Sequence, residues 1–369
     1  MESNCATKEG TLRYADRFAS QTAPDHFRRQ QDLMMSSIGI GTYLGHWDAA
    51  TDRLYEESVR RSIELGCNVI DSAINYRFQR SERNIGAALK QLFADGAASR
   101  DEIILATKGG YFPFDGEMPR DPHAWIKQNI IDAGAARPED IVDTHCMSPN
   151  YLDNQLSRSL ANLGLECIDI YYIHNPEAQL DRLAREEFLR RIRAAFEFLE
   201  KAVADGRIKF YGTATWNGYR QPPLARGYLS LAELEKIARE IAGPAHHFRA
   251  VQLPYNLTMP EAYISSNQMI DGEYISLLEA ARRLGITVMS SASMLQARLA
   301  ANLPGFIRQS LVGLATDAQR AIQFVRSTPS VTTALVGMSH SAHVEENMKT
   351  ARVPPLSVED FRRMIESAG

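Results

Sequence analysis

Short apolar runs recur along the chain, and between them lie stretches whose apolar positions have helical spacing. Eight such runs can be recognised. They are SIGIG (37–41), NVIDSA (68–73), EIILATK (102–108), IDIYYIHN (168–175), KFYGTAT (209–215), RAVQLPYN (249–256), ITVMSSA (286–292) and TTALVGM (332–338). Apolar runs of this length, bounded by turn residues, are typical of buried strands.

The amphipathic stretches predict helices, for example YEESVRRSIELG (55–66), SERNIGAALKQLF (81–93) and LDNQLSRSLANLG (152–164). Several of these stretches end at a glycine, as helices with a C-cap do. Alternating strands and helices indicate parallel strands joined by crossovers, and eight such units favour an α/β fold of the (β/α)8 TIM barrel type over an open sheet. We therefore predict a single barrel domain over residues 1–369.

Two segments fall outside this repeat. In residues 1–35, an N-terminal extension, TLRYADRF (11–18) and DHFRRQQD (25–32) are expected to pair as a hairpin that caps the barrel floor. Residues 109–148 form a long connection after the third strand, rich in Gly and Pro, and such loops commonly act as lids or binding loops. A disordered insertion is the alternative.

Composition excludes several classes of protein. The chain is 44% apolar and 23% charged with a net charge of -4, which gives no reason to expect nucleic acid or an anionic membrane as a partner. No window approaches 18 consecutive apolar residues and the N-terminus lacks a secretory h-region, so we expect a cytoplasmic protein. The four cysteines form no CxxC pair, and we expect neither disulfides nor zinc, with Cys67 and Cys167 as small buried residues.

Four polar residues close or follow the predicted strands, where the active site of such a barrel lies. They are Asp71, Tyr76, Lys108 and His174. A phenol with an ordinary pKa of about 10 is a weak acid near neutrality, and a nearby ammonium would lower that pKa. We expect Lys108 to do so, Asp71 to hold the lysine, and neutral His174 to orient a carbonyl oxygen. Such a set suits protonation of an oxygen.

The sequence resembles the aldo-keto reductases from about Thr11 to the end of the chain. The matching segments are GIGTYLG, IDSAINY followed by SERNIG, LATKGG, DIYYIHNP, YGTATWNG, VQLPYN and GMSHSAHVEEN. The resemblance is to the longer-chain branch that includes the potassium-channel β subunits. It implies reduction of small aldehydes or ketones with NADPH, with NADH possible, and it places Asp71, Tyr76, Lys108 and His174 on the family's catalytic tetrad.

The resemblance also implies the residues that hold the nicotinamide cofactor. They are Gly41, Thr42, Tyr43, Asp71, Ala214, Thr215, Gln252, Ser291, Ala292, Arg298, Gly337, Ser339, His343, Glu346 and Asn347. Among these, Gln252 matches the amide that holds the carboxamide, and Glu346 with Asn347 matches the pair that contacts adenine. The G-x-G-x-x-x-G spacing of GIGTYLG is not a Rossmann fingerprint, because no helix starts there.

The chain departs from the family where the seventh strand ends. Ser291 stands at the position of the aromatic that stacks on the nicotinamide, and Ser293 stands at that of a proline. The last segment lacks the Arg or Lys that many members use for the 2′-phosphate, although Ser339 matches a serine of the longer-chain branch.

The substrate pocket is expected to include Tyr43, Tyr76, Tyr111, Phe112 and His174, but the natural substrate and the oligomeric state cannot be predicted. The main alternative function is an accessory subunit that senses the cofactor with little turnover. An isomerase or phosphate enzyme would need a Gly-rich phosphate loop after the last two strands, and none is present. The pairs His145-Cys146 and His246-His247 have no further ligands at metal spacing, so no metal is expected.

Overall fold

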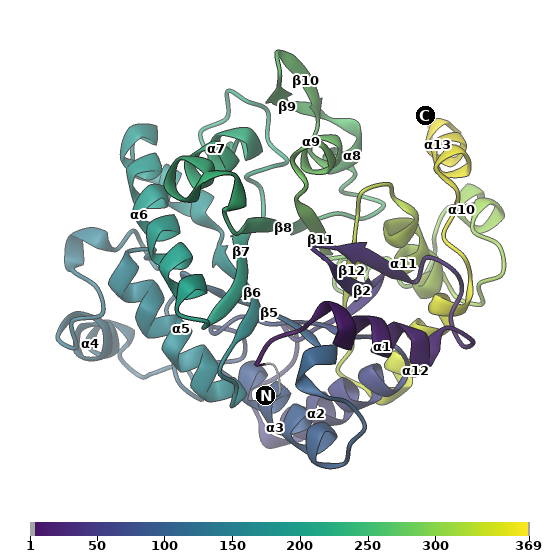
Figure 1. Ribbon diagram of the computed structural model, residues 1–369, viewed down its shortest axis with the longest axis horizontal. Coiled ribbons are helices and arrows are strands. Elements are labelled where there is room, and N and C mark those ends of the chain that lie inside the picture. Colours follow the sequence, from purple (N-terminus) through teal and green to yellow (C-terminus); the bar gives the residue numbers. More distant parts are fainter. Residues whose placement is uncertain (1–3, 368–369) are drawn as a thin grey trace.

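Eight parallel strands close into a barrel in the computed structural model, which describes residues 4–367 (Figure 1). The last of these strands pairs with the first, with Gly337 beside Gly41. The barrel strands are β3 (Ile38–Gly41), β4 (Val69–Asp71), β5 (Ile104–Gly109), β6 (Ile168–His174), β7 (Ile208–Ala214), β8 (Phe248–Pro254), β11 (Thr287–Ser291) and β12 (Thr333–Gly337). Each coincides with one of the predicted apolar runs, so the prediction of a (β/α)8 barrel is confirmed.

Side chains alternate between the two faces of each strand, as the period of two in a β-strand requires. Val69, Ile104 and Ile170 belong to the core inside the barrel, whereas their neighbours Ile70 and Leu105 belong to the larger core beneath the helices. Both faces are apolar because helices cover the outside and side chains fill the inside. The same alternation decides which residues at the strand ends point into the barrel mouth.

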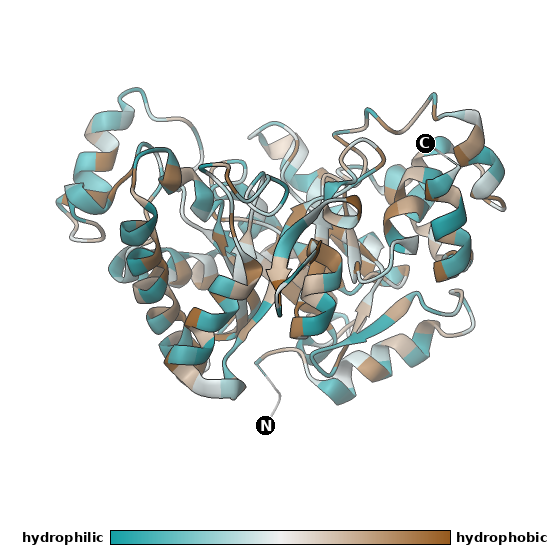
Figure 2. Cartoon of the chain, turned by 90° about the horizontal axis from the view of Figure 1, so that it is seen from above, coloured by the Kyte–Doolittle hydropathy of each residue, from teal (hydrophilic) through white to brown (hydrophobic). Residues whose placement is uncertain are grey.

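The helices surround the barrel, and Figure 2 shows hydrophilic and hydrophobic residues side by side along them. They are α1 (Lys8–Phe18), α2 (Ala49–Glu64), α3 (Arg80–Ala94), α4 (Pro122–Ile126), α5 (Pro149–Leu163), α6 (Arg185–Ala204), α7 (Leu231–Ala242), α8 (Glu261–Ile264), α9 (Leu277–Leu284), α10 (Gly305–Ser310), α11 (Asp317–Ser327), α12 (Ser341–Met348) and α13 (Val358–Glu366). Within residues 4–367, no helix has the length and apolar character that crossing a membrane requires.

Local chemistry explains where these helices begin and end. The carboxylate of Asp48 accepts a hydrogen bond from the Thr51 amide at the start of α2, which satisfies one of the free N–H groups there. At the other end of α5 and of α9, Gly164 and Gly285 adopt left-handed conformations with φ of 65°. The predicted glycine C-caps are therefore confirmed at both positions.

The N-terminal segment differs from the prediction. Residues 11–18 lie in helix α1, because the Thr7 hydroxyl caps Gly10 and because Thr11, Tyr14, Ala15 and Phe18 are buried at helical spacing. The hairpin is formed instead by β1 (Phe27–Gln30) and β2 (Leu33–Ser36). Leu33 and Met35 of β2 pack into the barrel's inner core beside Val69 and Ile104, the first residues of their strands. A hairpin thus does cover the barrel floor, but the expected pairing with residues 11–18 was wrong.

The connection at residues 109–148 contains helix α4, a π-helical turn at Lys127–Ile131 and a 3-10 turn at Pro138–Asp140. It has a small hydrophobic core of its own, in which Phe112, Ile130 and Ala135 pack with Tyr151 of helix α5. The alternative of a disordered insertion is therefore wrong. A second hairpin, β9 (Ser266–Ile270) with β10 (Glu273–Ser276), precedes α9 and was not predicted.

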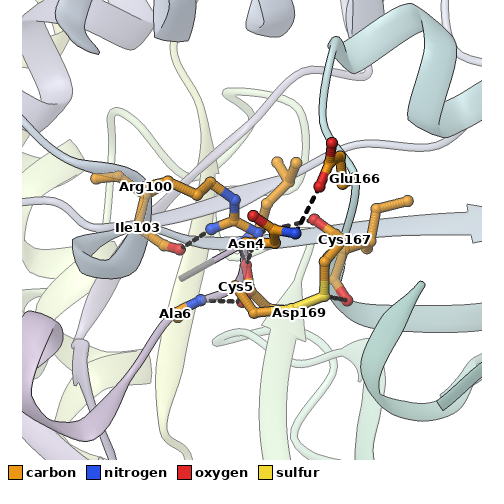
Figure 3. The surroundings of a disulfide bond; sticks show 10 residues. Asn4, Cys5, Ala6, Arg100, Ile103, Glu166, Cys167 and Asp169 are labelled. Atoms are coloured by element: carbon orange, nitrogen blue, oxygen red, sulfur yellow. Dashed lines mark hydrogen bonds and ion pairs between the residues drawn. A yellow bond between two sulfur atoms is a disulfide. The ribbon is translucent and has the colours of Figure 1, made fainter. Parts of the chain in front are cut away.

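A disulfide joins Cys5 to Cys167, just before β6, across a sequence separation of 162 residues (Figure 3). The expectation of no disulfide was therefore wrong, whereas Cys67 and Cys167 are both buried as predicted, and Cys67 is a free thiol. Beside the disulfide, the buried carboxylate of Asp169 accepts hydrogen bonds from the Ala6 and Leu105 amides, at 2.7 and 2.8 Å. The disulfide and the contact with Ala6 exist because the N-terminal segment returns to the start of β6, a proximity that cysteine spacing alone does not reveal.

Candidate active site

Strand alternation carries four polar side chains into the barrel mouth. Asp71 lies two residues beyond inward-facing Val69, Lys108 two beyond Ala106, His174 two beyond Tyr172, and Gln252 two beyond Ala250. Each lies at or near the carboxyl end of its strand, the end at which barrel enzymes carry their active sites. The ends of four strands therefore bring four reactive or hydrogen-bonding groups close together in the barrel mouth.

Lys108 and Asp71 form a buried ion pair at the base of this group. The ammonium donates to both carboxylate oxygens, at 2.9 and 2.7 Å, and to the Ser72 carbonyl at 2.6 Å. The two residues are 1% and 5% exposed, so each charge depends on the other for stabilisation. Gln252 donates a further hydrogen bond to Asp71, at 2.7 Å. The predicted salt bridge between Asp71 and Lys108 is present.

Tyr76 lies above the ion pair on the loop that follows β4. Its ring packs edge-on against Tyr43 and His174, with centroid separations of 4.9 and 5.8 Å, and the Lys108 ammonium is 4.9 Å from the centre of the ring. The next residues, Arg77 to Gln79, form a turn with φ between 48° and 70°. The Arg77 guanidinium holds this turn by donating to Asp52 at 2.5 Å and to the His46 carbonyl at 2.8 Å.

The pKa of Tyr76 differs from the sequence-based expectation. Desolvation raises it well above its ordinary value, and the charge of Asp71 raises it further. The expected net lowering of this pKa by Lys108 does not result, because burial and the charge of Asp71 outweigh the ammonium 4.9 Å from the centre of the ring. Burial also lowers the pKa of Lys108 itself, while Asp71 opposes that shift. Tyr76 is consequently a firmly protonated phenol.

His174 is neutral in this environment. Burial lowers its pKa well below the ordinary value, and the nearby charge of Lys108 lowers it further. Its backbone carbonyl accepts a hydrogen bond from His145 Nε2 at 2.7 Å, and Gln179 donates to Nδ1 of the same His145 at 3.1 Å. Burial brings the pKa of His145 down to about 4, so a neutral imidazole also supports the strand end that carries His174.

These side chains open into a cleft of about 650 Å³. Most of the residues predicted to contact cofactor or substrate line it: Gly41, Thr42, Tyr43, Asp71, Tyr76, Tyr111, His174, Ala214, Thr215, Gln252, Ser291, Ala292, Arg298 and Gly337. Lys108 lies behind Asp71 and does not line the cleft.

Five other predicted residues also lie outside the lining of the cleft. Phe112 packs within the core of the 109–148 loop, because its ring meets Tyr151, so its assignment to the substrate pocket was wrong. Ser339, His343, Glu346 and Asn347 follow β12 on the approach to α12 and on that helix. Asn347 is buried, and the Glu346 carbonyl accepts a hydrogen bond from Gln319.

Sequence reasoning missed several residues of the cleft. Asn175 and Trp216 directly follow predicted residues, so proximity in sequence could have found them. Residues 293–297 also line the cleft. Leu295, Gln296 and Ala297 have φ of 47°, 53° and 67°, a left-handed turn without glycine that no sequence signal predicts.

The cleft offers groups that suit a nicotinamide carboxamide. The Thr215 hydroxyl is buried and has no hydrogen-bond partner among residues 4–367. The side chains of Gln252 and Ser291 lie in the same cleft. Within the described part of the chain, no group of three or more His, Cys, Asp or Glu residues could hold a metal ion.

The fold and this site define an oxidoreductase of the barrel type. The family model described as the aldo/keto reductase family matches residues 37–297, and the chain belongs to that family.

Curated relatives match over most of their length. A candidate voltage-gated potassium channel subunit beta of Schizosaccharomyces pombe is 24% identical over 365 residues, with 95% of this chain and 94% of the relative covered. The L-glyceraldehyde 3-phosphate reductase of Escherichia coli O157:H7 is 25% identical, with 89% and 87% covered.

Solved structures share the fold. An aldo/keto reductase from Klebsiella pneumoniae, in complex with NADP and acetate, superposes with a TM-score of 0.62 at 20% identity, covering 94% of this chain and 95% of that one. The glycerol dehydrogenase of Gluconobacter oxydans has a TM-score of 0.64 at 18% identity, with 93% and 95% covered.

Proposed function

We propose that the protein reduces small aldehydes or ketones to alcohols with NADPH, and that Tyr76 donates the proton. The observation that carries this proposal is the edge-on contact of Tyr76 with neutral His174 in the cleft, above the ion pair of Lys108 with Asp71. A protonated phenol and a neutral imidazole can both donate a hydrogen bond to one carbonyl oxygen.

Each residue of the site has its own role in the proposed reduction. The substrate oxygen accepts hydrogen bonds from Tyr76 and His174, which polarises the carbonyl and fixes its orientation. A nicotinamide dinucleotide held in the cleft would supply the hydride for the carbonyl carbon. Tyr76 transfers its proton to the oxygen as that oxygen gains negative charge, and the resulting phenolate is stabilised by the positive charge of Lys108 beneath the ring. Asp71 keeps Lys108 charged in a buried position.

Thr215, Gln252 and Ser291 would hold the nicotinamide amide, while Arg298, Ser339, His343, Glu346 and Asn347 would contact the adenosine half. No aromatic stands at Ser291, so stacking on the nicotinamide must come from another group. NADPH is the first choice because Ser339 can hydrogen-bond a 2′-phosphate and Arg298 lies exposed at the cleft. NADH also stays a candidate, since a relative in Escherichia coli is named an NADH-specific methylglyoxal reductase.

Measuring turnover distinguishes the proposed reductase from the alternative of a cofactor-sensing subunit. The similarity to the S. pombe channel subunit supports that alternative. The experiment is to follow the absorbance of NADPH and of NADH with nitrobenzaldehyde, glycolaldehyde and propanal. We expect steady-state oxidation with at least one of them, and tighter binding of NADPH in a fluorescence titration. Binding without turnover on a broad panel of carbonyl compounds would favour the sensor. Tighter binding of NADH would refute the cofactor preference.

The directions of the two pKa shifts predict a broad pH plateau for reduction. The raised pKa of Tyr76 keeps the acid protonated beyond its ordinary value, and the lowered pKa of His174 keeps the imidazole neutral as the pH falls below about 6.5. We therefore expect kcat/KM for an uncharged aldehyde to change little between about pH 6 and about pH 9. A loss of activity with a midpoint at the ordinary histidine pKa would contradict this.

A further inference from the structure

Tyr111 is held in the cleft more firmly than its position on a long loop would suggest. It follows Gly110, whose φ of 146° and close approach to His145 exclude a side chain there. The Tyr111 carbonyl accepts hydrogen bonds from Gln155 at 2.6 Å and from the Tyr151 hydroxyl at 3.0 Å. The position of Tyr111 is thus set by helix α5 as well as by β5.

The Tyr111 ring is fixed as well. It packs edge-on against His145 and against His174, with centroid separations of 5.3 and 5.1 Å. Because the His174 ring also contacts Tyr76, with a centroid separation of 5.8 Å, its imidazole is in edge-on contact with two tyrosines. The mechanism uses only one of these two phenols.

The hydrogen bond made by the Tyr111 hydroxyl leaves its proton available. Asn175 Nδ2 donates to the hydroxyl oxygen at 3.2 Å, so the O–H bond itself must point elsewhere. Among residues 4–367, no hydrogen bond from this hydroxyl to an acceptor is present, and both residues line the cleft. Burial raises the pKa of Tyr111, which keeps the proton in place. The hydroxyl is therefore a donor directed at whatever occupies the cleft.

We propose that Tyr111, positioned by Asn175, recognises a second oxygen on the carbon next to the reacting carbonyl, so that the preferred substrates are α-hydroxy or α-oxo carbonyl compounds. This inference rests on the proposed function, because the carbonyl itself must be held by Tyr76 and His174. A carbonyl oxygen held by Tyr76 and His174 would place the adjacent carbon in the same cleft as the Tyr111 hydroxyl, whose ring also packs against His174. Tyr111 thereby contributes a polar contact rather than only an apolar wall.

The test uses glycolaldehyde and propanal, which differ only by a hydroxyl in place of a methyl group. The quantity measured is the ratio of their kcat/KM values, each corrected for aldehyde hydration. Tyr111→Phe should lower this ratio about 10-fold, since one hydrogen bond to the substrate is lost. Asn175→Asp should lower the ratio similarly although the phenol remains. The new carboxylate would accept a hydrogen bond from the Tyr111 hydroxyl, which would then no longer donate to the substrate.

Tyr228→Phe is the control. It removes a tyrosine hydroxyl outside the cleft, one that donates to the Asn267 carbonyl at 2.7 Å, and it should leave the ratio within about twofold. An unchanged ratio in Tyr111→Phe, an equal loss with both aldehydes, or an equally lowered ratio in Tyr228→Phe would overturn the inference. The proposed function fails separately, if the wild-type protein reduces neither aldehyde. Fluorescence titration with NADPH verifies that each variant retains its fold.

Discussion

Replacing Tyr76 with Phe is expected to lower reductive turnover by at least about 10², because the variant loses the proton donor but keeps the ring. The ring supports its neighbours through packing alone, at 4.9 Å from Tyr43 and 5.8 Å from His174. The Kd for NADPH should therefore change little. Single-turnover and steady-state assays measure the turnover, and a cofactor titration measures the Kd for NADPH.

The matched control for this prediction is Tyr228→Phe. That variant also removes a tyrosine hydroxyl, but one that donates to the Asn267 carbonyl at 2.7 Å outside the cleft. We expect it to retain wild-type turnover. If Tyr76→Phe retained wild-type activity, Tyr76 would not be the acid and the proposed mechanism would be wrong.

A double-mutant cycle on Asp71 and Lys108 should reveal strong coupling. Asp71→Asn leaves a buried ammonium without its counterion, and Lys108→Met leaves a buried carboxylate with only Gln252 as a side-chain donor. Each single change should lower the free energy of unfolding by about 3 to 5 kcal/mol. The double variant should lose much less than the sum, because neither charge is then left unpaired. Urea denaturation of the four proteins measures the coupling.

If the double variant instead loses the sum of the two single losses in unfolding free energy, this expectation is contradicted. Each residue would then be stabilised by other neighbours. The pair Arg29 and Asp32 provides a control cycle, since both side chains are more than half exposed and their bond at 2.5 Å lies on the surface. Exposed pairs of this kind contribute about 0.2 to 1 kcal/mol. Activity should be lost in all three variants of the buried pair, whatever their stability.

The barrel could be predicted because the signals that specify its strands and helices lie within short stretches of the sequence. Each strand is a short apolar run, and glycines such as Gly164 and Gly285 mark the ends of helices directly in the sequence. Asp71, Lys108 and His174 could also be predicted, because the period of two in a strand fixes which face a residue occupies. Tyr76 lies on the loop five residues beyond Asp71, where the period of a strand no longer applies, and its place in the site follows instead from the resemblance of IDSAINY to the family.

The features that could not be predicted depend on contacts between segments that lie far apart in the sequence. The lowered pKa of Lys108 and the raised pKa of Tyr76 arise mainly from burial, which is a property of the packed molecule. Phe112 is as apolar as a pocket residue should be, but whether it turns to the cleft or to the core of its own loop depends on Tyr151. Residues 11–18 carry both helical and strand character, and the cap at Thr7 decides between them.

The disulfide between Cys5 and Cys167 makes the first three barrel strands, β3, β4 and β5, part of a covalently closed loop. A pulling force applied at the two ends of the chain would pass through the sulfur–sulfur bond and would bypass everything between the two cysteines. The 162 peptide units enclosed there would remain unextended, which hides roughly 550 Å of contour length. Only a reducing agent would release that length, so a force-extension record would distinguish the oxidised from the reduced chain one molecule at a time.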